Sequence, residues 1–347
     1  MSSIPKTQKA FVLTKTGDSL DVLKYQQDYP VPTDLSPHDI LIKNKYSGVN
    51  YIENYFRTGI YPVEKPTVLG REATGVIVAK GEQIQDFNIG DSVAYLSTRT
   101  FAQYTKYNIN ENSQILKLSE NGSSKVSDDD LKLYAASLIQ GLTALTFSER
   151  AYKVKSGDYV LVYAAAGGVG LLLNQLIRAK GAHPIAIAST DEKLKLASEN
   201  GAEFLIKSKI DGTDDDKVVE QVLKFTNGEG VAAVFDSLGK NSFDISMKAL
   251  KRLGTFVSFG NATGVVPPIS INVLSPKNIT LLRPVVFHYI YTRKEFEQYT
   301  AKLFDLIRSG KLNILIYKTY PLSEYKVADQ ELLDRKTVGK LVLKIPE

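Results

Sequence analysis

A chain of 347 residues with a formal net charge of only +5 is too weakly basic for a nucleic-acid-binding arm or a polybasic membrane patch. It contains no cysteine, which excludes disulfides, thiolate zinc sites and cysteine nucleophiles. Its length predicts about two domains. The N-terminus lacks an apolar signal-peptide region, and no apolar run reaches the roughly 20 residues of a membrane-spanning helix. We therefore expect a cytoplasmic protein, with the nucleus left open as a second location.

Residues 1–133 are expected to be rich in short strands. Lys9–Leu13 and Ile40–Tyr46 alternate apolar and polar residues as half-buried strands do. Further short strands are expected at Val76–Lys80, Ser92–Tyr95 and Ala102–Thr105. This spacing predicts a β-barrel-like domain. A polar linker begins at Asn121, and the run Asp128–Asp130 is typical of either a helix N-terminus or a solvated surface.

Residues 134–284 alternate strands with helices. A helix over Leu131–Glu149, interrupted near Gly141, leads into the strand Tyr159–Ala164. Further strands are expected at Pro184–Ser189, Phe204–Lys207, Val231–Asp236 and Thr255–Phe259, with helices at Asp191–Asn200, Lys217–Thr226 and Phe243–Leu250. Asn278–Arg283 is one more strand candidate. The alternation predicts an α/β domain with a parallel, doubly wound sheet.

Residues 285–347 change the pattern again. Helices are expected at Glu295–Arg308 and Lys326–Asp334, and strands at Asn313–Tyr317 and Lys340–Ile345. A closing segment with strands of its own is suited to complete the first domain. We therefore predict a β-rich domain of residues 1–133 and 285–347, with the α/β domain of residues 134–284 inserted in it.

The stretch Tyr159–Leu173 carries the clearest functional motif. Its buried strand is followed by AAGGVG at residues 165–170 and then by an apolar helical segment. Glycines at a helix start let backbone amides approach a pyrophosphate, whose negative charge the helix dipole favours. Ala165 stands where the G-x-G-x-x-G fingerprint has its first glycine, so a plain tight turn is the alternative. The order strand, turn, helix favours dinucleotide binding.

The end of the next strand indicates which dinucleotide binds. Ser189 lies about 20 residues beyond the glycines, where NAD-specific sites carry an acidic residue. Ser189, Thr190 and Lys193 offer instead two hydroxyls and an ammonium, which suit a 2′-phosphate. We therefore predict NADPH. The alternatives are that Lys193 is an ordinary exposed lysine and that Asp191, beyond the strand end, binds the ribose of NADH.

Several motifs in order resemble the medium-chain dehydrogenase/reductase superfamily, and within it the zinc-free quinone oxidoreductase or zeta-crystallin family, especially its yeast members. The motifs are GVNYIENY at 48–55, LGREATG at 69–75, GLT at 141–143, AAAGGVG at 164–170, FDSLG at 235–239, VSFGN at 257–261 and RKTVGK at 335–340. The resemblance covers essentially the whole chain. It implies a Rossmann-type domain inserted in a GroES-like barrel that forms the catalytic domain.

The resemblance also implies a reaction without a metal. Zinc-containing relatives hold a catalytic metal with cysteine and histidine, and the matching positions here are Asn50 and Arg71. The three histidines, His38, His183 and His288, have no partner spacing. The implied activity is hydride or electron transfer from NADPH to quinones, ortho-quinones in particular, or to reactive α,β-unsaturated carbonyls. One-electron products are an alternative outcome.

Two residues match positions beside the nicotinamide and the substrate. Asn50 is expected to donate to a carbonyl oxygen or to the cofactor. Tyr55 either hydrogen-bonds the developing oxyanion or only walls the pocket as a packed aromatic. The implied cofactor contacts are Asn50, Gln140, Thr143, Ala166, Gly167, Gly168, Val169, Ser189, Thr190, Lys193, Ser208, Phe259, Gly260, Asn261 and Arg335.

The resemblance implies partners as well. Pairing at the edge strand Asn278–Arg283 would give a homodimer, whereas a covered edge would leave a monomer. A second functional hypothesis is binding of AU-rich RNA, or a crystallin-like structural role, gated by NADPH. The sequence has no dense basic stripe with interleaved aromatics to favour RNA binding.

Overall fold

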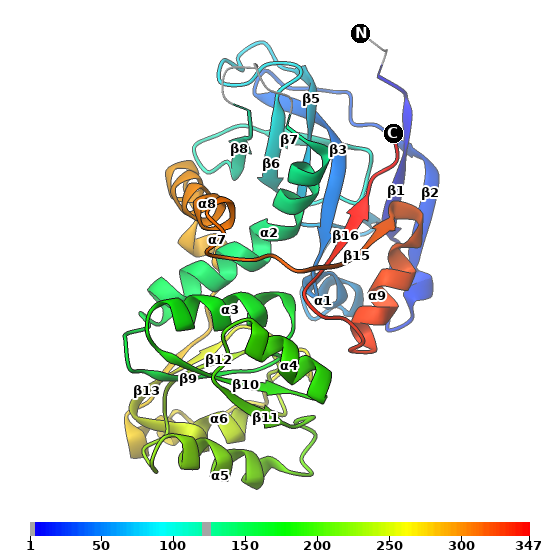
Figure 1. Cartoon of the computed structure of the whole chain (residues 1–347). Helices are drawn as coiled ribbons and strands as arrows, with labels where there is room; N and C mark the ends of the chain where they lie inside the picture. The colour runs from blue at the N-terminus through cyan, green and yellow to red at the C-terminus, as the bar shows by residue number, and fades with distance from the viewer. Residues whose placement is uncertain (1–3, 120–125) are drawn as a thin grey trace. The chain divides into compact units, whose positions relative to one another are not determined.

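The computed structural model describes residues 4–119 and 126–347, and the chain divides into two compact units (Figure 1). The first unit comprises Met1–Ile139, Ile290–Asp305 and Ile314–Glu347, and the second comprises Gln140–Tyr289 and Leu306–Asn313. The start of the predicted polar linker at Asn121 lies outside the described residues. The second unit is therefore largely one insertion between segments of the first, and it also takes Leu306–Asn313 from the closing segment.

The first unit is built mainly of antiparallel strands. Its larger sheet has the order β15-β16-β3-β5-β6-β8, and β7 also pairs with β3. The strands are β3 (Asp39–Val49), β5 (Glu72–Lys80), β6 (Ser92–Leu96), β7 (Tyr104–Asn108), β8 (Ile115–Lys117), β15 (Ile316–Pro321) and β16 (Lys340–Lys344). A smaller sheet, in the order β2-β1-β4, comprises β1 (Thr7–Leu13), β2 (Leu23–Pro30) and β4 (Thr67–Val68).

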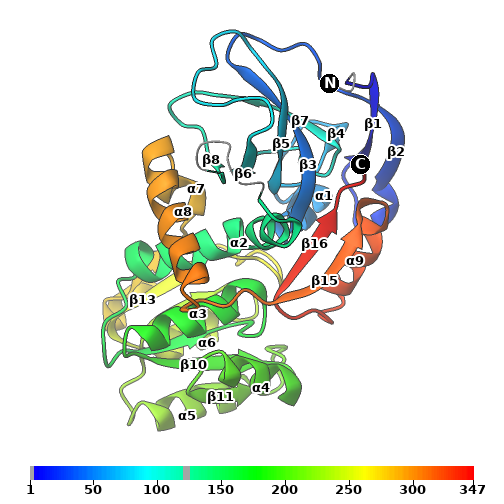
Figure 2. The same cartoon turned by 45° about the horizontal axis from the view of Figure 1, so that its top comes forward.

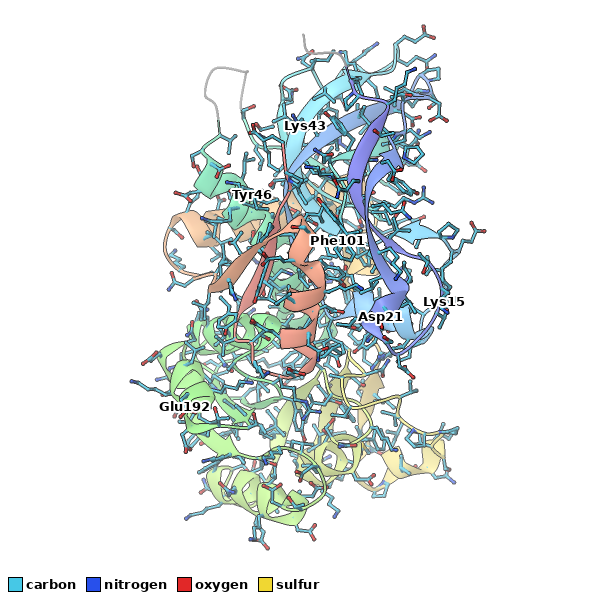
Figure 3. The ribbon with its side chains drawn as sticks, turned by 90° about the vertical axis from the view of Figure 1, so that its right-hand side faces the viewer. Lys15, Asp21, Lys43, Tyr46, Phe101 and Glu192 are labelled. Carbon is cyan, nitrogen blue, oxygen red and sulfur yellow. The ribbon has the colours of Figure 1, made fainter. Side chains whose placement is uncertain are left out.

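Aromatic side chains join these sheets to helix α9 (Tyr325–Leu333). The ring of Tyr325 lies 4.7 Å from that of Phe101 and 5.1 Å from that of Phe11, measured between centroids. All three rings are buried, and burial of large apolar area is the main stabilising contribution to such a core. Figure 3 labels Phe101 and also Tyr46 on β3, whose hydroxyl donates to Asp128 at 2.5 Å.

The closing segment completes the first unit, as predicted. Strand β16 pairs antiparallel with β3, with Leu341 opposite Val49, and parallel with β15. The predicted strand at Asn313–Tyr317 is wrong in position, because the strand begins at Ile316. Leu315, just before the strand, is already bonded to β16, because its carbonyl accepts from the Lys340 amide at 2.8 Å.

The second unit contains a six-stranded sheet in the order β11-β10-β9-β12-β13-β14, with every pairing parallel. The strands are β9 (Tyr159–Val162), β10 (His183–Ala188), β11 (Phe204–Lys207), β12 (Val231–Asp236), β13 (Leu250–Ser258) and β14 (Thr280–Leu282). The central strands are buried along their length, as strands covered by helices on both faces must be. This confirms the predicted doubly wound sheet.

Helices cover both faces of that sheet. Figures 1 and 2 show α3 and α4 on one face and α5 and α6 on the other. The bounds are α3 (Gly168–Ala179), α4 (Asp191–Glu199), α5 (Asp215–Phe225) and α6 (Phe243–Ala249). The remaining helices are α1 (Ile52–Thr58), α2 (Asp128–Thr146), α7 (Val286–Tyr289) and α8 (Arg293–Arg308).

The predicted interruption of α2 near Gly141 is wrong. The helix runs unbroken from Asp128 to Thr146, and a π-helical turn, Phe147–Ala151, follows it. The residues around Gly141 are fully or nearly buried, and packing on both sides offsets the roughly 1 kcal/mol by which glycine weakens a helix.

Candidate active site

Asn50 lies between the end of β3 and the start of α1, and its side-chain amide is held on every side. Its Nδ2 donates to Glu72 Oε1 at 2.9 Å and to the Gly48 carbonyl at 3.3 Å. Its Oδ1 accepts from Lys340 Nζ at 2.6 Å. Because both amide hydrogens have acceptors, donation to a substrate or cofactor, as predicted from the sequence, requires one of these bonds to exchange. The longer bond, to Gly48, is the weaker of the two.

Glu72 is the centre of this network. The first residue of β5, it is fully buried, and its Oε1 also accepts from Lys340 Nζ at 2.6 Å. Its Oε2 accepts from the backbone amide of Ile139 on α2 at 2.7 Å. A Cβ on Gly48 would lie 2.3 Å from Glu72 Oε1, so this position needs glycine for the carboxylate to fit.

Neither Glu72 nor Lys340 was assigned a role from the sequence, although both stand inside motifs quoted there. The sequence gives only a weak indication that these two residues belong to the site. Each is a charged residue that begins a strand, a place where a charge is usually exposed. Only their convergence from distant strands shows that they pair.

Tyr55, on α1, is buried and belongs to an aromatic cluster. Its ring makes edge contacts with Tyr51 at 5.5 Å and with Tyr61 at 5.2 Å between centroids. Such contacts fix the ring in place. The arrangement suits either predicted role, since a fixed ring can wall a pocket and can also aim its hydroxyl.

A second acidic group lies beside Asn50. Glu53 is buried, and its Oε2 accepts from the backbone amide of Asn50 at 3.1 Å. Burial raises the pKa of Glu53 to about 8, against the opposing effect of the nearby Arg71 and Lys340 charges. Arg71 itself lies over the ring of Phe56 at 4.4 Å. A pKa raised in this way favours the protonated carboxyl of Glu53 at neutral pH.

In the second unit, the predicted pyrophosphate site is a helix N-terminus without a side-chain cap. Gly167 is the N-cap of α3 and makes no side-chain hydrogen bond to the first turn. A Cβ on Gly170 would lie 2.4 Å from the Ala164 carbonyl, so the turn is tight enough to require glycine there. The first-turn amides, including those of Gly168 and Val169, are suited to an anion, and the residues fit a pyrophosphate.

The predicted 2′-phosphate residues lie together at the end of β10. Ser189 and Thr190 follow the strand, and Thr190 caps α4 by accepting from the backbone amide of Lys193 at 3.3 Å. The next residue, Asp191, is paired with Lys207 Nζ at 2.5 Å. This pair offsets the charge of Asp191, while a second carboxylate, Glu192, accepts a hydrogen bond from the Thr190 hydroxyl. The Ser189 hydroxyl and the Lys193 ammonium still suit the 2′-phosphate of NADPH.

Ser208 follows β11 at the same edge of the sheet, but its hydroxyl is engaged. It donates to Asp214 Oδ1 at 2.7 Å and accepts from the Ile210 amide at 2.9 Å. The side chain is also buried. Its geometry favours a role in shaping the loop after β11 over the predicted contact with the cofactor.

Phe259, Gly260 and Asn261 follow β13 in a tightly held loop. The Phe259 amide donates to the Asp236 carbonyl at 2.7 Å, and Arg283 donates to the Gly260 carbonyl at 2.9 Å. A Cβ on Gly260 would lie only 2.1 Å from the Ser237 carbonyl. Burial raises the pKa of Asp236 to about 6, opposed by three hydrogen bonds from the turn after β12 and by the Arg283 charge.

The carboxyl ends of the parallel strands thus bring most of the predicted cofactor residues to one edge of the sheet. These are Ala166, Gly167, Gly168, Val169, Ser189, Thr190, Lys193, Ser208, Phe259, Gly260 and Asn261. Gln140 and Thr143 are buried on α2 in the same unit. Asn50, Tyr55 and Arg335 belong to the first unit, where Arg335 has a left-handed backbone with φ of 56°.

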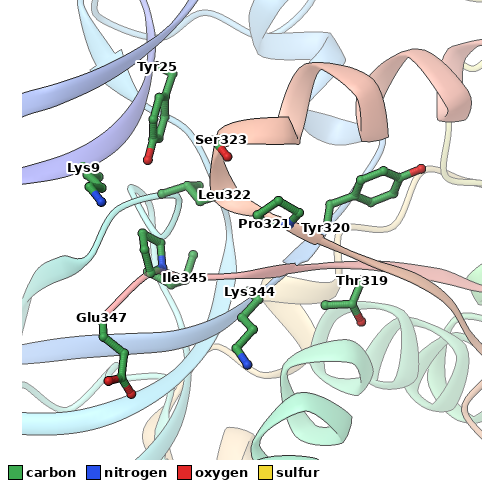
Figure 4. A pocket seen from close by; sticks show the side chains of 11 residues that line it. Lys9, Tyr25, Thr319, Tyr320, Pro321, Leu322, Ser323, Lys344, Ile345 and Glu347 are labelled. Carbon is green, nitrogen blue, oxygen red and sulfur yellow. The ribbon is translucent and has the colours of Figure 1, made fainter.

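A hollow of about 450 Å³ lies in the first unit near the C-terminus (Figure 4). Lys9, Tyr25, Ser323 and Lys344 are among the side chains that line it. It contains none of the predicted site residues. Within residues 4–119 and 126–347, no cluster of three or more His, Cys, Asp or Glu side chains is placed to hold a metal ion. Among the helices of the described residues, none combines the length and the apolar character that a membrane span requires.

Comparison with known families matches each part of this architecture. Residues 36–122 match the alcohol dehydrogenase GroES-like domain, and residues 168–305 match the zinc-binding dehydrogenase family. A GroES-like domain joined to a parallel dinucleotide-type sheet with a glycine-rich first turn defines a medium-chain dehydrogenase/reductase.

Individual relatives narrow this class. The chain is 42% identical to a probable quinone oxidoreductase of Schizosaccharomyces pombe over 95% of both chains. It is 32% identical to a 2-haloacrylate reductase of a Burkholderia species over 88% of this chain and 91% of that one. The structure of Escherichia coli quinone oxidoreductase complexed with NADPH superposes with a TM-score of 0.87 at 30% identity, covering 97% of this chain and 99% of that one. The chain belongs to the quinone oxidoreductase family and is an oxidoreductase.

Proposed function

We propose that this protein is an NADPH-dependent quinone reductase. The observation that carries the proposal is the uncapped N-terminus of α3, together with the hydroxyls and ammonium at the end of β10 and the balanced charge of Asp191. These features suit a dinucleotide that carries a 2′-phosphate. The E. coli relative complexed with NADPH supports the same cofactor. The S. pombe and E. coli relatives support a quinone as the acceptor.

The chain's own residues divide the binding of NADPH between them. Gly167, Gly168 and Val169 would hold the pyrophosphate with backbone amides. Ser189 and Lys193 would hold the 2′-phosphate. When bound, the nicotinamide supplies a hydride, and the protein orients the reactants and excludes water. With one proton added, a quinone becomes a hydroquinone and NADPH becomes NADP⁺.

A residue of the first unit would protonate the quinone oxygen after hydride transfer. Tyr55 would hydrogen-bond the reduced oxygen and deliver its proton, which water would restore. Tyr55→Phe keeps the ring contacts with Tyr51 and Tyr61 and removes only the hydroxyl. We expect kcat to fall about 100-fold with little change in NADPH affinity. An unchanged kcat would leave Tyr55 as a wall of the pocket.

Within this function, we propose ortho-quinones as the preferred substrates, with reactive α,β-unsaturated carbonyls as the alternative. The 2-haloacrylate reductase relative, whose named substrate is a conjugated acid, makes the alternative worth testing. NADPH consumption should be measured with an ortho-quinone, a para-quinone and an unsaturated ketone. Faster turnover of the ortho-quinone supports the first choice. No NADPH consumption with any of the three would overturn the proposed function.

The edge of the second unit's sheet is proposed as a homodimer contact. Among the described residues, strand β14 pairs only with β13, and Leu281 on it is partly exposed. The preceding 3-10 helix, Ile271–Lys277, exposes Ile271 to 80% and also exposes Val273. Apolar exposure along an unpaired strand edge is typical of an association surface. Light scattering should give twice the chain mass, and Leu281→Lys should reduce it to one chain mass.

A further inference from the structure

The orientation of the Asn50 amide follows from the chemistry of its neighbours. The ammonium of Lys340 can only donate, so the atom 2.6 Å from it is the amide oxygen. The carboxylate of Glu72 can only accept, so the atom 2.9 Å from it is the amide nitrogen. The two ends of the amide are therefore distinguished by opposite charges.

This arrangement depends on residues that are far apart in the chain. Asn50 follows β3, Glu72 begins β5 and Lys340 begins β16. The antiparallel register places Leu341 opposite Val49, which brings the ammonium beside Asn50. Glu72 and Lys340 are almost completely buried, with side-chain exposures of 0% and 4%. A buried pair of this kind costs desolvation free energy, so its contribution to stability alone is small.

We propose that Lys340 is a positioning residue that, together with Glu72, holds the side-chain amide of Asn50 in a single orientation for the reductase reaction. The inference rests on the proposed function, because Asn50 faces the acceptor only if that function is correct. Lys340 fixes the oxygen end of the amide and balances the charge of Glu72. Glu72 fixes the nitrogen end and is itself anchored by the Ile139 amide. The least strongly held hydrogen, directed to Gly48 at 3.3 Å, is then the one available to an acceptor.

Loss of the ammonium should act through Asn50. Lys340→Met leaves the amide oxygen without its donor and Glu72 without its counter-charge, so only the nitrogen end of the amide remains held. Misplacement of a reacting group by about 1 Å can reduce a rate about 100-fold. We expect kcat to fall between about 10-fold and 100-fold, whereas the NADPH dissociation constant should change less than about twofold, because the predicted phosphate contacts lie in the other unit.

The test is a double-mutant cycle between Lys340→Met and Asn50→Ala. The kcat with a quinone, the NADPH dissociation constant and the thermal unfolding midpoint should be measured for each variant. If Lys340 acts through Asn50, the double variant will have the kcat of Asn50→Ala alone. Losses in kcat that multiply, or an unchanged kcat in Lys340→Met, would overturn the proposal. A general structural role would lower the unfolding midpoint without this dependence on Asn50.

The chain offers a matched control on the same strand. Lys344, at the end of β16, is exposed and takes no part in the network. Lys344→Met makes the same chemical change, and its kcat should equal that of the wild type. If Lys340→Met does not fold, Lys340→Arg enters the same cycle, because it keeps the charge beside Glu72 and changes only the placement of the donor.

A measurement without turnover separates this proposal from the proposed function. The side-chain NH₂ of Asn50, identified in ¹⁵N spectra by its loss in Asn50→Ala, should give a sharp, slowly exchanging pair of signals in the wild type. In Lys340→Met the pair should broaden and exchange faster. Unchanged signals would overturn the positioning role even if the protein reduces quinones. Inactivity of the wild type toward every quinone would overturn the function and leave the NMR result standing.

Discussion

Lys207 and Asp191 form an ion pair of 2.5 Å that links the end of β11 to the first residue of α4. Both side chains are more than half exposed, so the pair contributes little to stability. The position of the pair, beside the predicted 2′-phosphate residues, matters more for cofactor binding than its contribution to stability does. Asp191 directly follows the predicted 2′-phosphate residues Ser189 and Thr190, and the ammonium of Lys207 offsets its charge.

Lys207→Ala should therefore weaken NADPH binding without affecting NADH. The unpaired Asp191 carboxylate would repel the 2′-phosphate, and an exposed charge of this kind changes binding by about 1 kcal/mol or less, or roughly two- to fivefold in the dissociation constant. Fluorescence titration with each dinucleotide measures the effect. The double variant Lys207→Ala, Asp191→Asn should recover the wild-type NADPH affinity. A double variant as weak as Lys207→Ala would mean that Lys207 contacts the phosphate directly.

Lys193→Ala should have a larger effect. A hydrogen bond to a charged group contributes about 1.5–3 kcal/mol, so the NADPH dissociation constant should rise about 10-fold to 100-fold. NADH, which lacks the 2′-phosphate, should bind as before. Lys195→Ala is the matched control, because Lys195 lies on the same helix and pairs with Glu199. Equal losses for NADPH and NADH would contradict the predicted 2′-phosphate site.

Gly170→Ala should destabilise the second unit. The new Cβ would lie 2.4 Å from the Ala164 carbonyl, and neither backbone segment can move without disturbing the turn. Overpacking of this kind costs about 1–3 kcal/mol in the free energy of unfolding. Gly167→Ala is the comparison, since its Cβ would lie 3.2 Å from the same carbonyl and its φ of −77° suits alanine. Chemical unfolding should give Gly170→Ala a clearly lower free energy of unfolding than Gly167→Ala. The reverse order would show that the turn relaxes to accept the new Cβ.

Glu53 should make stability depend on pH. Burial raises its folded-state pKa to about 8, from 4.5 in an unfolded chain, so the folded state binds a proton more tightly than the unfolded state does. The resulting stabilisation is present below about pH 4.5 and is lost as the pH rises toward 8. Glu53→Gln imitates the protonated acid and cannot lose a proton.

The unfolding midpoint of Glu53→Gln should therefore fall less between pH 5 and pH 9 than that of the wild type, with the variant the more stable protein at the alkaline end. Arg71, Lys340 and Asp329 all influence Glu53 and are unchanged in the variant. Glu64→Gln, at an exposed glutamate, should keep the wild-type pH dependence. Identical pH profiles for Glu53→Gln and the wild type would show that Glu53 is ionised in the folded protein.

The strands and helices of the second unit could be predicted from the sequence, because its strands are short apolar runs separated by amphipathic helices. That signal is local, and each predicted strand overlaps an observed one. The elements of the first unit were harder to predict. Strand β2 (Leu23–Pro30) was missed because it is a polar strand with little apolar alternation, and α1 was missed because its seven residues are too few to show a helical period.

The Asn50 network could not be predicted for a different reason. A charged residue at the start of a strand is ordinarily solvated, so neither Glu72 nor Lys340 stands out alone. Their pairing is set by sheet register, which a single sequence does not specify over such separations. The helix cap at Thr190 and the glycine turn before α3 were predictable because both depend on neighbours within a few residues.

The position of β16 near the C-terminus of the sequence also determines when the Asn50 network can form during synthesis. The bond between Lys340 and Asn50 joins residues 290 positions apart, so it is among the most non-local contacts of the fold. On the ribosome, β5 and β7 can pair with β3 early, but the segment Tyr46–Val49 must wait for nearly the entire polypeptide before β16 arrives. The second unit, whose sheet is continuous in sequence, can form meanwhile. A nascent chain should thus acquire its nucleotide-type sheet first and its Asn50 arrangement last, with one edge of Tyr46–Val49 unpaired in between.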